Sequence, residues 1–464
     1  MTDGTRSCAQ RWDEARTLVD ALDPQVKSVI TWVDASFEDA VEADRISMTG
    51  DGAGPLHGLL VGLKDNIDTA GVRTTAGASF LSDHVPDADA EAVRRLRRAG
   101  AVVVAKLNMA ELAWGATTQN ATYGACRNPW DLDRIPGGSS GGSGAALAAR
   151  FCEASLGTDT GASVRVPAAL NGVVGLRPTF GAISNRGVFP VSYTQDTVGP
   201  MAPSALTVAR MTHALTAHDP LDPYSRRSSG RDVLDLVGAK LAGVRVGVPT
   251  TFFFDDLDPG VSQRVDAFLG WLRGAGALLV PVEDFGQAQA FEHWTRIVQC
   301  EGAAVHEKRL RSSPSDFSPD VLGRVSAGLD VPATELARSL DWRARYRHRL
   351  GGVLSAVDLI LTPVVPVDVP QAEGYDSRAQ TQALGPITYP WALHAGPTLS
   401  LPVGFHPTSG LPVGVALSAA EWDEARLFQV ATAYQEETEW HLEEPPLLRQ
   451  ARASLPLLHD QEPA

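Results

Sequence analysis

The pattern of apolar and polar residues predicts alternating strands and helices in the first quarter of the chain. An uninterrupted apolar run, residues 59–63, predicts a buried strand that ends at Lys64. Residues 89–99 repeat apolar side chains at helical spacing, and residues 101–105 predict a second strand followed by Lys106. This strand–helix–strand order favours an α/β fold in which helices surround a sheet.

The remaining pattern divides the chain into segments of different character. Residues 1–50 have helix-like spacing and predict an N-terminal helical segment packed on the rest of the protein, and residues 285–350 predict mostly helices. The apolar runs 357–363 and 396–405 contain proline, which is typical of buried strand ends. Residues 445–464 are rich in proline and charge and predict a surface tail.

Composition narrows the classes of partner that the protein can bind. With 464 residues, 44% hydrophobic, the chain can bury a large core as one large domain or as two to three ordinary ones. A net charge of −15 argues against a nucleic-acid partner, and no apolar stretch reaches the roughly 20 residues that span a membrane.

No signal peptide begins the sequence, so we expect a cytoplasmic protein. Neither a zinc site nor a disulfide framework is indicated by the scattered cysteines Cys8, Cys126, Cys152 and Cys300.

A glycine-rich run, PGGSSGGSGAALAAR (Pro136 to Arg150), is the most unusual local feature. It has neither the GxxxxGK[ST] pattern of a phosphate loop nor the GxGxxG spacing of a dinucleotide site, so no phosphate-bearing cofactor is predicted. The remaining interpretation is a turn that exposes a nucleophilic side chain. Residues 138–142 match GxSxG, the elbow of α/β-hydrolases, with Ser140 as nucleophile. That alternative needs an apolar strand before the turn, and the approach here is polar and broken by proline.

The other form of this interpretation uses a lysine as the base that activates a serine. A lysine accepts a proton only when it is neutral. Because its ordinary pKa is near 10.4, deprotonating it at pH 7 costs roughly 4–5 kcal/mol. Burial lowers a lysine pKa by up to about 3–5 units, which covers this cost. Lys64 and Lys106 both follow buried strands, so position alone does not choose between them.

Three stretches, taken together, resemble the amidase signature family. They are GLLVGLKDNIDTAGVRTTAGA (Gly58 to Ala78), PGGSSGGSGAALAA (Pro136 to Ala149) and GTDTGASVRVPAALNGVVGLRPTFG (Gly157 to Gly181). The resemblance implies a single large α/β domain over residues 1–464, in which a central mixed β-sheet is flanked by helices on both faces. It also implies a signature core over residues 58–201 and a helical region on the substrate side over residues 285–350.

The resemblance implies a Ser–cisSer–Lys triad without cofactor or metal. Ser163 matches the nucleophile, Ser139 the bridging serine held by a cis peptide bond, and Lys64 the base, whereas Lys106 matches no catalytic position. The expected oxyanion hole consists of the backbone N–H groups of Thr160, Gly161, Ala162 and Ser163. The expected supporting residues are Ser140 as a hydrogen-bonding partner, with Asp159 and Arg165 as residues that fix the loop.

Two departures from the family pattern bear on the substrate. Ala162 stands where the family usually has glycine, and it would be strained if this position required a positive φ. Ala392 and Ala395 stand where asparagine and glycine are usual, in a stretch that commonly borders the pocket. Aromatic side chains in residues 285–350 and 370–396 are candidates for the pocket walls: Trp294, Trp342, Tyr346, Tyr375, Tyr389 and Trp391.

The function implied by the resemblance is a stand-alone serine hydrolase, a monomer or homodimer, that cleaves the C–N bond of a small amide-like molecule. Related esters or carbamates are possible substrates of the same acyl-enzyme chemistry. Two alternatives remain at this point. One is the glutaminase A subunit of a tRNA-dependent amidotransferase, and the other is a catalytically silent binding protein on the same scaffold.

Overall fold

The computed structural model describes residues 6–50, 52–374 and 376–455. Its centre is an 11-stranded sheet in the order β1-β3-β2-β6-β8-β7-β12-β13-β11-β9-β10. The strands of this sheet are β1 (Val29–Trp32), β2 (Leu60–Lys64), β3 (Val102–Leu107), β6 (Ala154–Asp159), β7 (Val174–Arg177), β8 (Thr197–Ala202), β9 (Arg245–Pro249), β10 (Leu278–Val282), β11 (Leu359–Pro363), β12 (Thr398–Phe405) and β13 (Pro412–Ser418). A separate hairpin is formed by β4 (Gln119–Asn120) and β5 (Gly124–Ala125).

The sheet is mixed. Strands β3, β2 and β6 are parallel to one another, as are β11, β9 and β10 at the other end. Between these groups the strands from β6 to β11 pair antiparallel, and β1 is an antiparallel edge strand on β3. This confirms the mixed sheet implied by the signature motifs.

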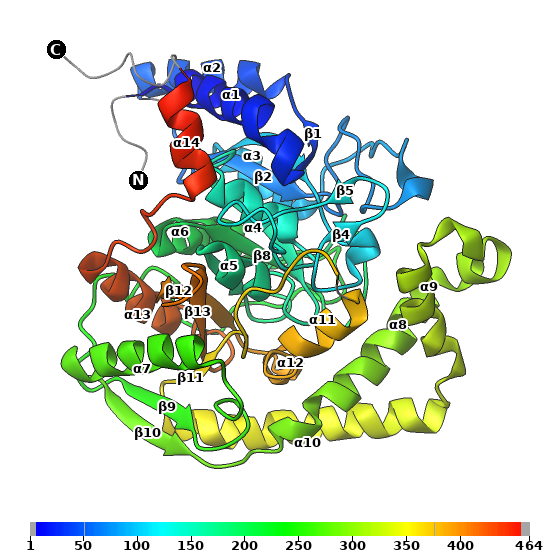
Figure 1. Ribbon diagram of the computed structural model, residues 1–464, viewed down its shortest axis with the longest axis vertical. Coiled ribbons are helices and arrows are strands. Elements are labelled where there is room, and N and C mark those ends of the chain that lie inside the picture. Colours follow the sequence, from blue (N-terminus) through cyan, green and yellow to red (C-terminus); the bar gives the residue numbers. More distant parts are fainter. Residues whose placement is uncertain (1–5, 51, 375, 456–464) are drawn as a thin grey trace.

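Helices cover both faces of the sheet (Figure 1). They are α1 (Cys8–Val26), α2 (Ser36–Thr49), α3 (Glu91–Arg98), α4 (Gly141–Ala148), α5 (Arg165–Asn171), α6 (Ala205–Leu215), α7 (Pro259–Gly274), α8 (Ala290–Ser312), α9 (Pro319–Ser326), α10 (Ala333–Ala356), α11 (Ser377–Leu384), α12 (Tyr389–Leu393), α13 (Glu424–Glu437) and α14 (Pro446–Ser454). Strand residues alternate between two cores, as the period of two requires. Val61 and Leu63 of β2 pack in the core shared with α3, α6, α7 and α13, whereas Leu60 packs with α1 and α4.

Residues 285–350 are mostly helical, as expected, and form the long pair α8 and α10 with the short helix α9 (Figure 1). Helix α8 also packs against α12. None of the helices in the described ranges combines the length and apolar character needed to cross a bilayer.

Two expectations from the pattern need correction. Residues 1–50 are not helical throughout, because Val29–Trp32 forms β1 and pairs with the backbone of β3. The expected surface tail, residues 445–464, is helical over Pro446–Ser454, and this helix, α14, lies near α1 (Figure 1). Its Leu448 is buried in the same core as α1. Proline at the first position of α14 and Leu448 and Ala451 on one face explain this helix. The last nine residues of the predicted tail lie outside the described residues.

Candidate active site

Strand β2 places the ε-amino group of Lys64 in the interior of the molecule. Its side chain is fully buried, and Nζ lies 2.7 Å from Ser139 Oγ, 2.8 Å from Thr158 Oγ1 and 3.4 Å from the Thr158 carbonyl oxygen. All three partners are uncharged. Burial lowers the pKa of Lys64 to about 7, against the opposing effect of the carboxylates of Asp196 and Asp159. Burial therefore brings the pKa of Lys64 into the neutral range.

The glycine-rich run holds Ser139 against a neighbouring segment, residues 108–118. The peptide bond between Gly138 and Ser139 is cis, and the Ser139 carbonyl accepts a hydrogen bond from Ala110 N at 3.0 Å. A Cβ atom at position 138 would lie 2.7 Å from Thr117 N, and one at position 142 would collide with the carbonyl oxygen of Asn108. Glycine is needed at both positions because the two backbones touch.

Ser163 lies in the loop between β6 and α5, next to the glycine-rich run. Its carbonyl accepts a hydrogen bond from Ser140 N at 3.2 Å, which joins the two loops. Ser163 is half-buried, and within the described part of the chain its hydroxyl has no hydrogen-bond partner. The structure thus brings Lys64 and Ser139 into direct contact and places the backbone of Ser163 beside them.

A buried ion pair fixes the loop that carries Ser163. Arg165 Nε and Nη2 each lie 3.0 Å from one oxygen of Asp159, and Arg165 Nη2 also donates to the Gly161 carbonyl at 2.7 Å. Burial by itself raises the pKa of Asp159, but the guanidinium groups of Arg165 and Arg177 outweigh it and hold this pKa below its usual value. Asp159 and Arg165, two of the three expected supporting residues, therefore hold the loop and are shielded from solvent.

The backbone N–H groups from Thr160 to Ser163 are free to bind another molecule. Among the residues that the structure describes, none of them has an acceptor. Ala162 does not have a positive φ, so the alanine found in place of the usual glycine carries no backbone strain. Gly161 is needed for another reason, because a Cβ there would lie 2.6 Å from Trp294 Cζ2 and 3.0 Å from Tyr389 Cε1.

Ser140 is buried beneath the site. Its hydroxyl accepts from Thr158 N at 3.3 Å and donates to the Thr158 carbonyl at 3.2 Å, so it ties the glycine-rich run to β6. No histidine of the described ranges forms a hydrogen bond with Ser140. The elbow interpretation therefore lacks its base, and Ser140 has the supporting geometry expected from the resemblance.

Lys106 is separate from this site, although it is equally buried. Its Nζ donates to the Ile67 carbonyl at 2.7 Å and to Thr74 Oγ1 at 2.5 Å, and it lies 3.5 Å from Asp65 Oδ1. Burial lowers its pKa to about 8, and the charge of Asp65 opposes that shift. The structure thus gives Lys106 an ion-pair partner and no contact with the serines.

The sequence analysis missed three residues that contact the site, namely Thr158, Arg177 and Asp196, and it named Trp294 only as a candidate pocket wall. Thr158 and Arg177 lie within the quoted motifs, so their polar side chains on buried strands were a usable signal. Asp196 accepts from Thr160 Oγ1 at 2.6 Å, and Trp294 Nε1 donates to the Thr160 carbonyl at 3.1 Å. No local pattern predicts these two contacts with Thr160, because Asp196 and Trp294 approach the loop from other segments of the chain.

The candidate aromatic wall residues divide into two groups. Trp294 and Tyr389 lie against Gly161, with ring centroids 4.2 Å apart. Tyr346 and Trp391 are buried in a core behind the site, and Trp342 stacks on Tyr346. Tyr375 lies outside the described residues.

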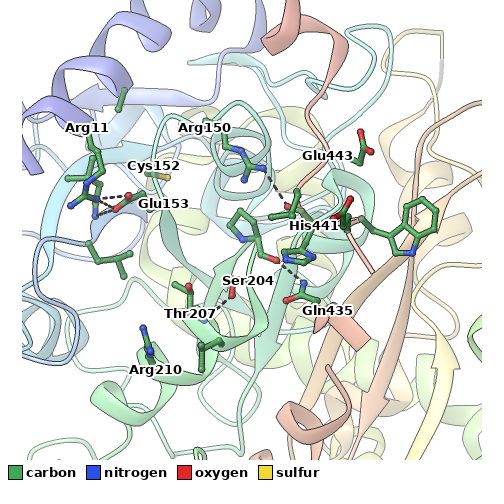
Figure 2. A pocket seen from close by; sticks show the side chains of 18 of the residues that line it. Arg11, Arg150, Cys152, Glu153, Ser204, Thr207, Arg210, Gln435, His441 and Glu443 are labelled. Carbon is green, nitrogen blue, oxygen red and sulfur yellow. Dashed lines mark hydrogen bonds and ion pairs between the residues drawn. The ribbon is translucent and has the colours of Figure 1, made fainter. Parts of the chain in front are cut away.

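A groove of about 1110 Å³ opens elsewhere, between α1, α6, α13 and α14 (Figure 2). It is lined by Leu59 and Leu60 at the start of β2, whereas Lys64 lies at the end of that strand. None of the predicted site residues lines this groove. In the described ranges, no group of three or more His, Cys, Asp or Glu side chains is arranged to hold a metal ion.

Comparison with known proteins agrees with these motifs. A match to the Amidase family covers residues 16–428. The A subunit of the glutamyl-tRNA(Gln) amidotransferase of Chloroflexus aggregans is 34% identical in an alignment of 456 positions that covers 93% of each chain. A solved protein from a vestigial complex that reveals the evolutionary origins of an s-triazine catabolic enzyme is 33% identical over 94% of this chain and 96% of its own, with a TM-score of 0.88. A peptide amidase bound to the competitive inhibitor chymostatin is 31% identical over 96% and 97%, with a TM-score of 0.83. The chain belongs to the amidase family, which is the amidase signature family that its three motifs resemble.

Proposed function

We propose that this protein is a stand-alone hydrolase that cleaves the carboxamide C–N bond of a small molecule through an acyl-enzyme, with Ser163 as nucleophile. The observation that carries the proposal is the environment of Lys64. A fully buried amine lies 2.7 Å from Ser139 Oγ, without a carboxylate partner and with a pKa lowered to about 7. Such a lysine is a base at neutral pH, because it does not pay the roughly 4–5 kcal/mol that an unshifted lysine needs for deprotonation.

The proposed reaction moves one proton through two hydroxyl groups. Neutral Lys64 accepts the proton of Ser139 while Ser139 accepts the proton of Ser163, and Ser163 Oγ attacks the carbonyl carbon. The negative charge that forms on the substrate oxygen is stabilised by the free N–H groups of residues 160–163. The proton returns through Ser139 to the leaving nitrogen, the C–N bond breaks, and water attacks the acyl-enzyme by the same relay.

The loop that carries Ser163 is preorganised for this reaction. Asp159, at the start of this loop, is paired with Arg165 inside the protein, and its pKa is lowered. Asp159 therefore stays ionised and does not take up the proton that the relay moves. Thr158 Oγ1, at 2.8 Å, is a second uncharged partner that orients the amine of Lys64. Because the donors are held before substrate arrives, little reorganisation opposes the attack.

Labelling and turnover test the proposal together. The purified chain is treated with a fluorophosphonate probe and screened against aryl amides, aliphatic amides, esters and carbamates. We expect labelling at Ser163 and turnover of at least one amide, and a loss of both by at least about 10⁴-fold in Ser163→Ala. The matched control is Ser143→Ala, since Ser143 lies in the same glycine-rich run and its buried hydroxyl has no partner within the described ranges. Wild-type protein that neither labels nor turns over would support a silent binding protein instead.

A second candidate function is the glutaminase A subunit of a tRNA-dependent amidotransferase. The 34% identity to such a protein over 93% of both chains favours it. The likeness to a peptide amidase over 96% of this chain supports the stand-alone activity. The two differ in what the purified chain does by itself. Glutaminase activity that appears only with a second subunit would establish the amidotransferase, whereas amide hydrolysis by the chain alone would establish the stand-alone enzyme.

A further inference from the structure

Three consecutive carbonyl groups in the loop before Ser163 accept hydrogen bonds from buried or half-buried side chains. The Asp159 carbonyl accepts from Arg177 Nη1 at 2.5 Å, the Thr160 carbonyl from Trp294 Nε1 at 3.1 Å and the Gly161 carbonyl from Arg165 Nη2 at 2.7 Å. Each of these carbonyls shares a rigid peptide unit with the N–H of the next residue. The three side chains therefore act on the peptide units that contain three of the proposed oxyanion donors.

The geometry of a trans peptide converts a bond to the carbonyl into a direction for the N–H. The two groups point to opposite sides of the chain, and in the described ranges the cis bond lies elsewhere, between Gly138 and Ser139. A donor that holds the Thr160 carbonyl therefore turns the N–H of Gly161 away from itself. That N–H has no acceptor in the described part of the protein.

Trp294 differs from the two arginines because its hydrogen bond to the Thr160 carbonyl is its one polar contact with this loop in the described part of the chain. Arg165 and Arg177 also surround the carboxylate of Asp159, so removing either would leave a buried charge poorly paired. Trp294 is uncharged and comes from α8, outside the signature motifs. Its ring packs on Tyr389 and lies against Gly161, where any Cβ would collide with it. The packing fixes the ring, and the fixed ring fixes the direction of its N–H.

We propose that Trp294 is a positioning residue that aims the N–H of Gly161 at the substrate oxyanion by holding the Thr160 carbonyl. This inference rests on the proposed function, because it requires that Ser163 reacts and that residues 160–163 form the hole. It assigns a catalytic consequence to a side chain of the helical region that the motifs do not include.

The test removes the indole N–H and keeps an aromatic ring. In Trp294→Phe we expect the rate of fluorophosphonate labelling and kcat for the best amide to fall about tenfold, which is less than the roughly 10²–10³-fold seen when a hole donor is deleted outright. KM should change little, and the pH midpoint of activity should stay in place because Lys64 and Ser139 are untouched. An enlarged KM with unchanged kcat would overturn the proposal and make Trp294 a wall of the substrate pocket.

Two controls keep the outcomes distinct. Trp271→Phe removes an indole N–H that donates to Glu437 on the surface, with the ring stacked on Phe268, and it should leave labelling and kcat unchanged. If Trp294→Phe fails to fold, benzothienylalanine at position 294 replaces only the N–H by sulfur, and wild-type rates with that analogue would refute the proposal. Wild-type protein that does not label at Ser163 refutes the proposed function itself.

Discussion

Two buried lysines lie on neighbouring strands and have different surroundings. Lys64 ends β2, and Lys106 lies near the end of β3, with both side chains fully buried. The parallel register pairs Leu63 with Lys106 and Lys64 with Leu107, so the two lysines extend from opposite faces of the sheet. Lys64 meets the uncharged hydroxyls of Ser139 and Thr158, whereas Lys106 meets the carboxylate of Asp65.

The comparison shows that burial alone does not make a lysine a base. Desolvation lowers both pKa values, to about 7 for Lys64 and to about 8 for Lys106. A nearby carboxylate stabilises the ammonium form and gives it a structural partner, as at Lys106. Hydroxyl partners leave the amine free to exchange a proton with them, as at Lys64.

The largest expected effect separates the two lysines by activity. Lys64→Met removes the proposed base while roughly keeping the side-chain volume, and we expect kcat/KM to fall by about 10²–10⁴-fold. The measurement is the steady-state rate on the amide found in the screen, with Ser163 labelling as a second readout. Activity within a few fold of wild type would remove Lys64 from the mechanism.

The next effect separates them by stability. Lys106→Met leaves Asp65 buried without its partner, and we expect the free energy of unfolding to fall by about 3–5 kcal/mol. Lys64→Met is the control, because it leaves no carboxylate in direct contact unpaired and should destabilise clearly less. Urea unfolding followed by tryptophan fluorescence measures both variants. Equal losses of unfolding free energy in the two variants would mean that the ion pair with Asp65 does not distinguish the Lys106 site from the Lys64 site.

The smallest effect is a shift along the pH axis. Because neutral Lys64 is the base, kcat/KM should rise about tenfold per pH unit below pH 7 and level off above the pKa near 7. Thr158→Val removes an acceptor that stabilises the ammonium form, so the pKa of Lys64 should fall and the midpoint should move to lower pH. A pH–rate profile of each protein tests this, and an upward shift would contradict it.

The contact between Lys64 and Ser139 was predicted from the family resemblance of the motifs that contain them. The strand before Lys64 and the glycine-rich run are visible in the order of residues, and glycine at position 142 reflects a backbone contact that the fold then supplies. The tail was harder to predict. Its helix α14 depends on Leu448 finding the core beside α1, more than 400 residues earlier in the chain.

The sequence by itself determined the α/β class through its periodicity, and its three motifs carry the family resemblance that singles out Lys64, Ser139 and Ser163 as the expected triad. It did not distinguish Lys64 from Lys106 by position, since both follow buried apolar runs. Only the tertiary structure decided which lysine meets hydroxyls and which meets Asp65, and which tryptophan reaches the Thr160 carbonyl. Those contacts join segments that lie far apart along the chain, and their partners are chosen by the register of the strands and the packing of α8, which no local pattern encodes.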